Sequence, residues 1–324
     1  MSQIIGRKYK LVQKYGTGQF STVCRGVCLQ SNKQVAIKME RSTVEYPLLK
    51  HEVNLLYYLA KQKCPCIPQV LYYGYQSPYM CLVMTFYEEG SLVSWKPDLS
   101  LQDILEWWNC AIDIVMHIHK AGIVHRDLKP AHFMRKVETN SWHLIDFGLA
   151  TTYWNTDNQH IENRTKEHLL GSPLYVSYYV HEGNELVRRD DFLSLVYIGW
   201  ELWFGEPVTG LTQPPQSTQS TLLQDPYNQW LKQEKSFDTL YSRLTQYESR
   251  RGHAYISPKW IQFFHFLLKH AELLEFSEKP LYGGFIIQHN GDTSDSEHSC
   301  TSGRSCTSGR SCTSGRSCTS DNSK

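Results

Sequence analysis

The segments HRDLKPAHFM (His125–Met134) and LIDFGLA (Leu144–Ala150) place charged residues at a fixed spacing in the middle of the chain. Asp127 and Lys129 lie two residues apart in the first segment, and Asp146 follows Asp127 by nineteen residues. An Asp or a Lys in a loop is usually no more than a solvated surface charge. Two upstream segments carry further residues of this kind, and a fold that brings all four segments together explains their order best.

The first upstream segment is GTGQFSTV (Gly16–Val23), which lies between two predicted strands. Glycines there let the backbone approach phosphate groups and donate N–H groups to them. Fifteen residues after Val23, the sequence VAIK ends in Lys38, and Glu52 lies on the helix that follows. A glycine-rich hairpin is usually only a turn and a strand Lys is usually an edge charge. In these positions, however, the Lys and the Glu can form the ion pair that holds nucleotide phosphates.

Together the four segments predict a site for phosphoryl transfer. Asp127 would accept a hydrogen bond from the attacking hydroxyl group and orient it toward the γ-phosphate, while Lys129 would balance charge on the transferring group. Asp146 offers a hard carboxylate oxygen, the ligand type that Mg²⁺ prefers. ATP and Mg²⁺ are therefore the expected cofactors, with Mn²⁺ as an alternative metal.

Two kinds of hydrophobic pattern divide the first 288 residues. Residues 9–87 contain short apolar runs typical of strands and one helical stretch. The predicted strands span residues 9–15, 21–29, 33–39, 69–75 and 80–86, and the helix spans 47–62. From about residue 90 the period becomes helical. Helices are expected from Leu101, from near Phe192 and over 260–274, with a polar loop over 211–226.

Composition limits the classes of function. The chain has 324 residues, 41% of them hydrophobic, so it can bury a large core. Its 33 basic and 32 acidic residues nearly cancel, which gives no electrostatic footprint for nucleic acid or a membrane surface. No apolar run suits a signal peptide or a membrane span. The ten cysteines form no C-x-x-C pair, so we expect neither a zinc site nor disulfides, and an intracellular protein of the cytoplasm, the nucleus or both.

These segments resemble the eukaryotic protein kinases over residues 9–288, and other features resemble the casein kinase I family. Ser21 stands where a third glycine is common, QHIENRTKEHLLGSPLYVSYYVHEGNE replaces the usual A-P-E motif, and RRDDFLSLVY opens the next long helix. The resemblance implies an α+β, bilobal protein kinase fold. Residues 9–87 would form a small β-sheet N-lobe with one helix, and residues 88–288 a larger helical C-lobe.

The resemblance also implies transfer of the ATP γ-phosphate to protein Ser or Thr, because Ser/Thr-specific kinases carry a Lys at the position of Lys129. It implies a kinase that needs no phosphorylation of its activation loop. The expected catalytic residues are Lys38, Glu52, Asp127 and Lys129.

Other residues receive supporting roles from the same resemblance. Asp191 is expected to brace the catalytic loop, and Met84 to be the gatekeeper residue, with the backbone of Thr85 and Tyr87 facing the adenine. The residues expected to bind the nucleotide are Tyr15, Gly16, Thr17, Gly18, Gln19, Phe20, Ser21, Thr22, Val23, Ala36, Lys38, Met84, Thr85 and Tyr87.

The first departure from the family pattern is His132, which stands where an Asn should hold one Mg²⁺ and stiffen the loop. An imidazole nitrogen is a poorer partner for Mg²⁺ than oxygen and suits Mn²⁺ or Zn²⁺ better. With Asp146, His132 is therefore a candidate metal ligand that binds one metal weakly. We favour an active kinase. A pseudokinase that binds nucleotide or acts as a scaffold is the alternative, and a small-molecule kinase is a third hypothesis.

Two further departures lie in the C-lobe. Casein kinase I enzymes favour a phosphate or acidic group three residues before the target, held by basic residues. Leu174 stands where an Arg is expected, and residues 211–224 contain no Lys or Arg, so a phosphate clamp is not expected there. Arg188 and Arg189 remain, and pairing with neighbouring acids is their simpler interpretation. Glu272 replaces another Arg, without a predicted consequence.

Residues 289–324 are expected to form a disordered tail, because CTSGRS repeats leave little apolar surface to bury. Serines recur at every third residue from Ser296 to Ser323. One hypothesis is autophosphorylation of this tail, which would then fold back on the active site. The simpler one is that the repeat alone creates the period. We expect a monomer that binds Ser- or Thr-containing protein substrates, acidic ones among them, and neither nucleic acid nor membranes.

Overall fold

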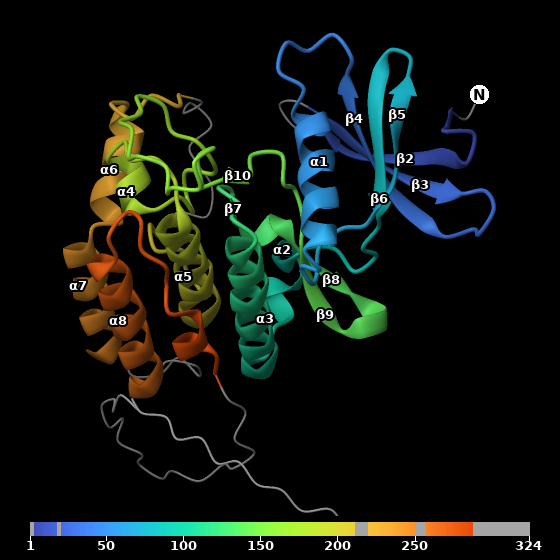
Figure 1. Ribbon diagram of the computed structural model, residues 1–324. Coiled ribbons are helices and arrows are strands. Elements are labelled where there is room, and N and C mark those ends of the chain that lie inside the picture. The colour runs from blue at the N-terminus through green and yellow to red at the C-terminus, as the bar shows by residue number, and fades with distance from the viewer. Residues whose placement is uncertain (1–2, 18–20, 211–219, 250–256, 288–324) are drawn as a thin grey trace, which may run out of the picture. The chain divides into compact units, whose positions relative to one another are not determined.

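The strands predicted over residues 9–87 form one antiparallel sheet in the computed structural model, which describes residues 3–17, 21–210, 220–249 and 257–287. The strand order is β1-β2-β3-β4-β6-β5 (Figure 1). All five predicted strands are confirmed, and β1 is an addition too short to show a pattern. The bounds are β1 (Ile4–Ile5), β2 (Tyr9–Thr17), β3 (Thr22–Cys28), β4 (Gln34–Arg41), β5 (Val70–Gln76) and β6 (Tyr79–Thr85).

Alternation along β4 decides which way Lys38 points. Successive side chains of a strand face opposite sides of the sheet. The side chains of β4 that pack into the sheet's own apolar cluster are Val35, Ile37 and Met39. Lys38 therefore faces the other side, where α1 (Leu48–Lys61) lies along the sheet (Figure 1). The predicted helix over residues 47–62 is thus confirmed.

The second part of the described chain is mainly helical. Its helices are α2 (Leu92–Trp95), α3 (Leu101–Lys120), α4 (Tyr178–His181), α5 (Arg188–Phe204), α6 (Pro226–Glu234), α7 (Phe237–Ser249) and α8 (Pro258–Leu273). Short strands and 3-10 turns connect them: η1 (Lys96–Asp98), β7 (Ile123–Val124), η2 (Pro130–His132), β8 (Phe133–Lys136), η3 (Val137–Thr139), β9 (Ser141–Leu144), β10 (Thr151–Thr152) and η4 (Tyr282–Phe285). Strand β7 pairs with β10, and β8 pairs with β9.

Helix α3 begins where a capping box forms. The Ser100 side chain accepts the Asp103 N–H, and the Asp103 carboxylate accepts the Ser100 N–H. The helix ends before Gly122, whose φ of +84° favours glycine. Between these ends its apolar face, which includes Trp108, packs against α5.

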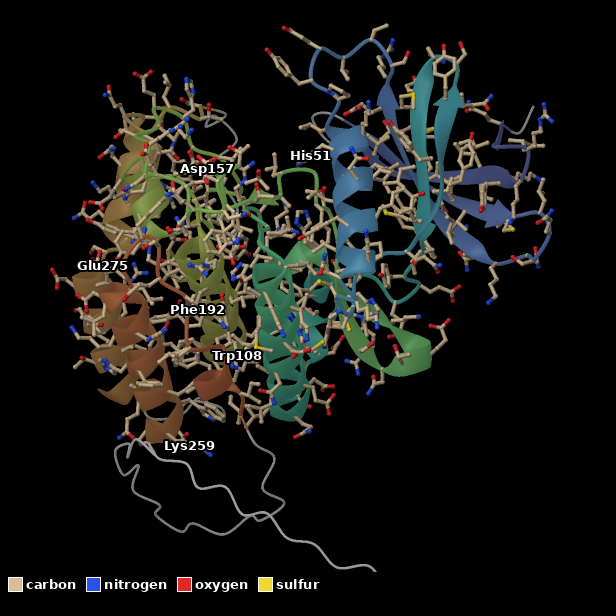
Figure 2. The ribbon with its side chains drawn as sticks, viewed as in Figure 1. His51, Trp108, Asp157, Phe192, Lys259 and Glu275 are labelled. Carbon is tan, nitrogen blue, oxygen red and sulfur yellow. The ribbon has the colours of Figure 1, made fainter. Side chains whose placement is uncertain are left out.

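Helix α5 is the centre of the helical part. All of its residues except Phe204 are buried, and α3 and α8 pack against it (Figure 1). Trp108 of α3 and Phe192 of α5 are both fully buried (Figure 2). A side chain at Gly199 would lie 2.9 Å from the Trp108 ring, so glycine permits this close packing. The helix begins at Arg188, as the RRDDFLSLVY segment predicted and four residues before the start near Phe192 that the apolar pattern indicated, and the Asp190 carboxylate accepts the Val187 N–H at 2.9 Å there.

Other sequence expectations have mixed outcomes. The helices predicted from Leu101 and over 260–274 are confirmed as α3 and α8, whereas α6 and α7 had not been predicted. The six cysteines in the described residues are free, as expected. No helix among the described residues is long and apolar enough to cross a membrane. The tail over 289–324 and residues 211–219 of the predicted loop lie outside the described residues.

Acid should destabilise this fold below pH 6.5. Burial lowers the pKa of His119 and His125, and it lowers that of His181 to about 2. An unfolded His titrates near 6.5, so below that pH the unfolded chain binds more protons than the native one. Each such group then removes about 1.4 kcal/mol per pH unit from the free energy of unfolding. We expect a lower Tm at pH 5.5 than at pH 7.5 at constant ionic strength, and an equal or higher Tm would contradict this.

Candidate active site

An ion cluster lies where β4 faces α1. The Lys38 Nζ atom is 2.7 Å from Glu52 Oε2 and 2.8 Å from Asp146 Oδ1. The Glu52 side chain is only 1% exposed, whereas that of Asp146 is 40% exposed. Lys38 is thus the charged partner that the buried Glu52 carboxylate requires, and it also holds the accessible Asp146 carboxylate beside Glu52.

The electrostatics of this cluster favour a protonated Lys38 and an ionised Asp146. Burial alone would lower the pKa of Lys38, but the charges of Glu52 and Asp146 outweigh burial and raise it. Burial alone would raise the pKa of Asp146. A hydrogen bond from His132 and the charge of Lys38 instead hold that pKa well below its ordinary value. Lys38 therefore remains protonated and Asp146 ionised at neutral pH.

Asp127 lies on the loop between β7 and β8, opposite this cluster. Its Oδ2 atom accepts a hydrogen bond from Lys129 Nζ at 2.7 Å, and its Oδ1 atom accepts one from Ser172 Oγ at 2.6 Å. Lys129 also donates to Ser172 Oγ at 3.0 Å. Gly171, with φ of +93°, makes the approach of Ser172 possible, because a Cβ atom there would lie 2.5 Å from the Arg126 carbonyl oxygen.

A cavity of about 310 Å³ connects these groups. Lys38, Glu52, Asp127, Lys129 and Asp146 all line it, although the most distant of them, Lys38 and Asp146, are 108 residues apart in sequence. The other lining residues are Ser21, Glu40, Leu48, Leu49, Gly148, Leu149, Gly171 and Ser172. The structure thus brings together all five of these predicted residues.

Residues 9–272 match the protein kinase domain family. The chain belongs to this family. Its two-part structure, an antiparallel sheet with one helix and a larger helical part, is the bilobal α+β kinase fold predicted from the sequence. The reaction class of the family is phosphoryl transfer from ATP to protein substrates with divalent metal ions.

Asp191, at the start of α5, holds the catalytic loop of this kinase. Its carboxylate accepts the His125 N–H at 2.7 Å, the Arg126 N–H at 2.9 Å and a hydrogen bond from His119 Nε2 at 2.9 Å. Burial would raise the pKa of Asp191, but His119 and the backbone donors lower it. Arg126 has φ of +68°, a strained value for a residue other than glycine. The hydrogen bond to Asp191 helps to stabilise it in this conformation.

His132 makes two contacts that together explain its position. Its Nδ1 atom is 2.8 Å from the Asp127 carbonyl oxygen, which can only accept, so Nδ1 carries a proton. Its Nε2 atom lies 3.3 Å from Asp146 Oδ2. Nδ1 of the histidine therefore makes a hydrogen bond within the catalytic loop, and Nε2 faces Asp146, the candidate metal ligand. It is 7% exposed and does not line the cavity.

Most of the described residues that were predicted to bind nucleotide lie on β2, β3, β4 and β6, whereas Ser21 precedes β3 and Tyr87 follows β6. Among them, only Ser21 and Lys38 line the described cavity. Those placed on the strands are Tyr15, Gly16, Thr17, Thr22, Val23, Ala36, Met84 and Thr85. Gly18, Gln19 and Phe20 lie outside the described residues.

The segment predicted to contain the gatekeeper residue lies at the end of β6. Met84 is 7% exposed, and the Thr85 N–H donates to the Gln69 carbonyl oxygen at 3.1 Å. Tyr87 is buried, and its hydroxyl lies 3.2 Å from His143 Nδ1. The Thr85 donor is thus engaged within the protein, and an adenine role for Thr85 and Tyr87 stays a prediction.

Sequence analysis missed several residues that build the site. Ser172 carried no signal in the sequence, because the segment that contains it lacks the A-P-E motif by which it would be located. His119 lies in an ordinary helical pattern, yet it links Asp191 to the Tyr282 hydroxyl of the C-terminal segment. His51 of α1 donates to the Ala150 carbonyl oxygen at 2.6 Å, which ties α1 to the segment after Asp146 (Figure 2). Only contacts between distant segments reveal these roles.

The pairing predicted for the two arginines is partly wrong. Arg189 NH2 lies 3.7 Å from Asp190 Oδ1, but Arg188 donates to the Ser277 carbonyl oxygen and packs on Tyr153. Both arginines are buried because they connect α5 to later or earlier segments. Glu272, whose replacement of an Arg had no predicted consequence, accepts hydrogen bonds from Lys269 at 2.9 Å and the Tyr241 hydroxyl at 3.1 Å.

Replacing Asp191 should damage catalysis without affecting nucleotide binding. Asp191→Asn keeps the shape of the side chain but loses the charge that three donors share, a cost of about 1–3 kcal/mol. We expect kcat about 10- to 100-fold lower, with the KM for ATP within about twofold. Asp113→Asn on the exposed side of α3 is the control and should leave both values unchanged. An equal loss of ATP affinity in Asp191→Asn would contradict the assignment.

Proposed function

We propose that this chain is an active serine/threonine protein kinase, a divergent relative of the casein kinase I enzymes. The observation that carries the proposal is the contact of Lys38 with both Glu52 and Asp146. A kinase aligned for catalysis needs this ion pair and an Asp in the position of Asp146. A chain that served only as a scaffold would not need to keep these three charges in contact.

Asp127 would act on the hydroxyl group of the substrate. Each of its oxygens accepts one hydrogen bond from the protein, from Lys129 or from Ser172, and an ionised carboxylate can accept more. The attacking hydroxyl could therefore be oriented by Asp127 while Lys129 Nζ faces the transferring phosphoryl group. Positioning and charge stabilisation of this kind supply most of the catalysis in phosphoryl transfer.

The contacts of Arg126 support a kinase that needs no activation-loop phosphate. Its Nε atom donates to the Leu149 carbonyl oxygen at 2.7 Å, and its NH1 atom lies 3.7 Å from Glu185 Oε1. Lys166 pairs with the same Glu185 at 2.8 Å. A carboxylate of the folded chain thus takes the position near Arg126 where a phosphate could otherwise order the loop.

Acidic substrates remain part of the proposal, but a strict requirement for a phosphorylated residue does not. Leu174 is 8% exposed and lies in a position predicted for an Arg. Arg188 and Arg189 are buried and hold other parts of the protein. Neither arginine can therefore reach a phosphate on a substrate peptide without leaving its partners.

The donor set suits a metal ion that is bound mainly by the nucleotide. Within the described residues, no group of three or more His, Cys, Asp or Glu side chains could hold a metal. Mg²⁺ in kinases is usually bound by one or two carboxylates together with substrate phosphates. The accessible Asp146 fits this pattern, and His132 Nε2 would add a nitrogen ligand in the neutral imidazole, in which it no longer donates to Asp146. When bound, the metal would neutralise phosphate charge.

Phosphoryl transfer is tested directly with radiolabelled ATP. We expect the wild-type chain to label casein on Ser or Thr, and Asp127→Asn to reduce incorporation at least about 100-fold, because the nucleophile loses its acceptor. Asp157→Asn, an exposed change on the segment after β10, is the matched control and should retain activity. Wild-type incorporation no higher than that of Asp127→Asn would support a pseudokinase instead.

His132 should shift metal preference toward Mn²⁺. A nitrogen ligand favours Mn²⁺ over Mg²⁺, and without nucleotide the site should bind either ion weakly. Electron paramagnetic resonance should show that free Mn²⁺ is depleted by the protein plus a non-hydrolysable ATP analogue, but little by the protein alone.

His132→Asn replaces nitrogen with the amide oxygen that Mg²⁺ prefers. We expect the ratio of Mg²⁺-supported to Mn²⁺-supported turnover to rise about tenfold, and the affinity of the nucleotide complex for Mn²⁺ to fall. No change in either measurement would mean that His132 does not contribute to the metal site.

A further inference from the structure

The stretch Pro173–Val176 follows the serine that contacts Asp127. Ser172 accepts the N–H groups of Tyr175 and Val176 at 2.9 and 3.0 Å through its carbonyl oxygen, so the stretch forms a tight turn. After it, the Ser177 hydroxyl donates to Asp190 and accepts the Val180 N–H, which caps α4. The turn is thus attached at one end to the catalytic Asp127 and at the other to the core.

Lys235, directly after α6, contacts both ends of this turn. Its Nζ atom donates to the Pro173 carbonyl oxygen at 2.6 Å and to the Val176 carbonyl oxygen at 2.7 Å. It also lies 3.2 Å from His181 Nε2. The lysine is fully buried, with a relative exposure of 0%, and lies over the Tyr197 ring.

The three polar contacts of Lys235 satisfy its buried amino group. Burial lowers the pKa of Lys235 well below its ordinary value, and no carboxylate in the described part of the chain pairs with it. Burial and the nearby Lys235 lower the pKa of His181 to about 2, so this imidazole is neutral. The Lys235 amino group has an N–H for each of the two carbonyl oxygens and a third polar contact with His181 Nε2. All three polar contacts of the amine are then satisfied.

We propose that Lys235 is a positioning residue that fixes the turn Pro173–Val176 relative to Asp127 and thereby governs binding of the protein substrate. This inference rests on the proposed function, because it assigns the turn to the peptide side of the same site. The hydrogen-bond partners of Lys235 Nζ all lie within residues 173–181, away from Lys38, Glu52 and Asp146. Loss of the amine should therefore affect peptide more than ATP.

The test compares Lys235→Met with Lys232→Met. Methionine keeps an unbranched side chain but has no N–H groups. Lys232 is on α6, three residues earlier, and makes a partly exposed ion pair with Glu182 at 3.5 Å and a contact over the Tyr178 ring, both outside the turn. We expect Lys235→Met to lower kcat/KM for a casein peptide at least tenfold and to keep the KM for ATP within twofold, whereas Lys232→Met matches the wild type.

A binding measurement separates this inference from the proposed function. A fluorescein-labelled casein peptide with Ala in place of the acceptor Ser reports affinity by anisotropy without any phosphoryl transfer. Weaker peptide binding by Lys235→Met, with unchanged binding of a fluorescent ADP analogue, supports the inference even if the wild type transfers no phosphate. Unchanged peptide binding overturns it, and so does a parallel loss of nucleotide binding, which indicates general unfolding.

A second variant covers the case in which Lys235→Met does not fold. Lys235→Gln retains N–H donors on a shorter side chain, so it should reach one carbonyl oxygen and give peptide affinity between those of wild type and Lys235→Met. Its Tm, measured without ligands, confirms that it is folded. The shorter Gln side chain cannot contact both carbonyl oxygens. Wild-type peptide affinity in folded Lys235→Gln would therefore contradict the proposed role.

Discussion

The hydrogen bonds of Asp191 are the constraint on which the site depends. A fully buried carboxylate at the start of α5 holds two successive backbone N–H groups of the catalytic loop, one of them on the strained Arg126. Burial of such a charge is tolerable only because several donors surround it. Since α5 is itself the centre of the helical part, the position of Asp127 is set by the core of the protein rather than by its own loop.

His132 shows how one position can separate two tasks. The Asn expected there would stiffen the loop and hold a metal ion. Through Nδ1, the histidine makes a loop contact with the Asp127 carbonyl oxygen. Through Nε2, it offers nitrogen rather than oxygen beside Asp146. The geometry around Asp127 is thus compatible with catalysis, while the proposed metal site would have a nitrogen donor in place of an oxygen.

The segment between Asp146 and Asp191 is held with few charges of its own. Arg126 shares Glu185 with Lys166, and Lys235 holds the turn after Ser172 through carbonyl oxygens. Backbone carbonyl groups are present whatever the side chains are, so this kind of anchor leaves no motif in the segment that it holds. Hydrogen bonds from Lys235 to carbonyl oxygens can replace an ion pair, because a buried amine with all its hydrogen bonds satisfied needs no opposite charge.

The sequence by itself determined the fold class, the strands from residue 9 to 86, helices α1, α3 and α8, and the residues that the cleft brings together. It could do so because alternation and helical period record which face is buried, and because the charged motifs keep a fixed order. The contacts of His119, Ser172 and Lys235, and the orientation of His132, were decided only by the tertiary structure. The side-chain hydrogen bonds of the first three residues join segments at least 43 residues apart in the chain, and the energy of a buried polar group depends on partners that no local pattern specifies.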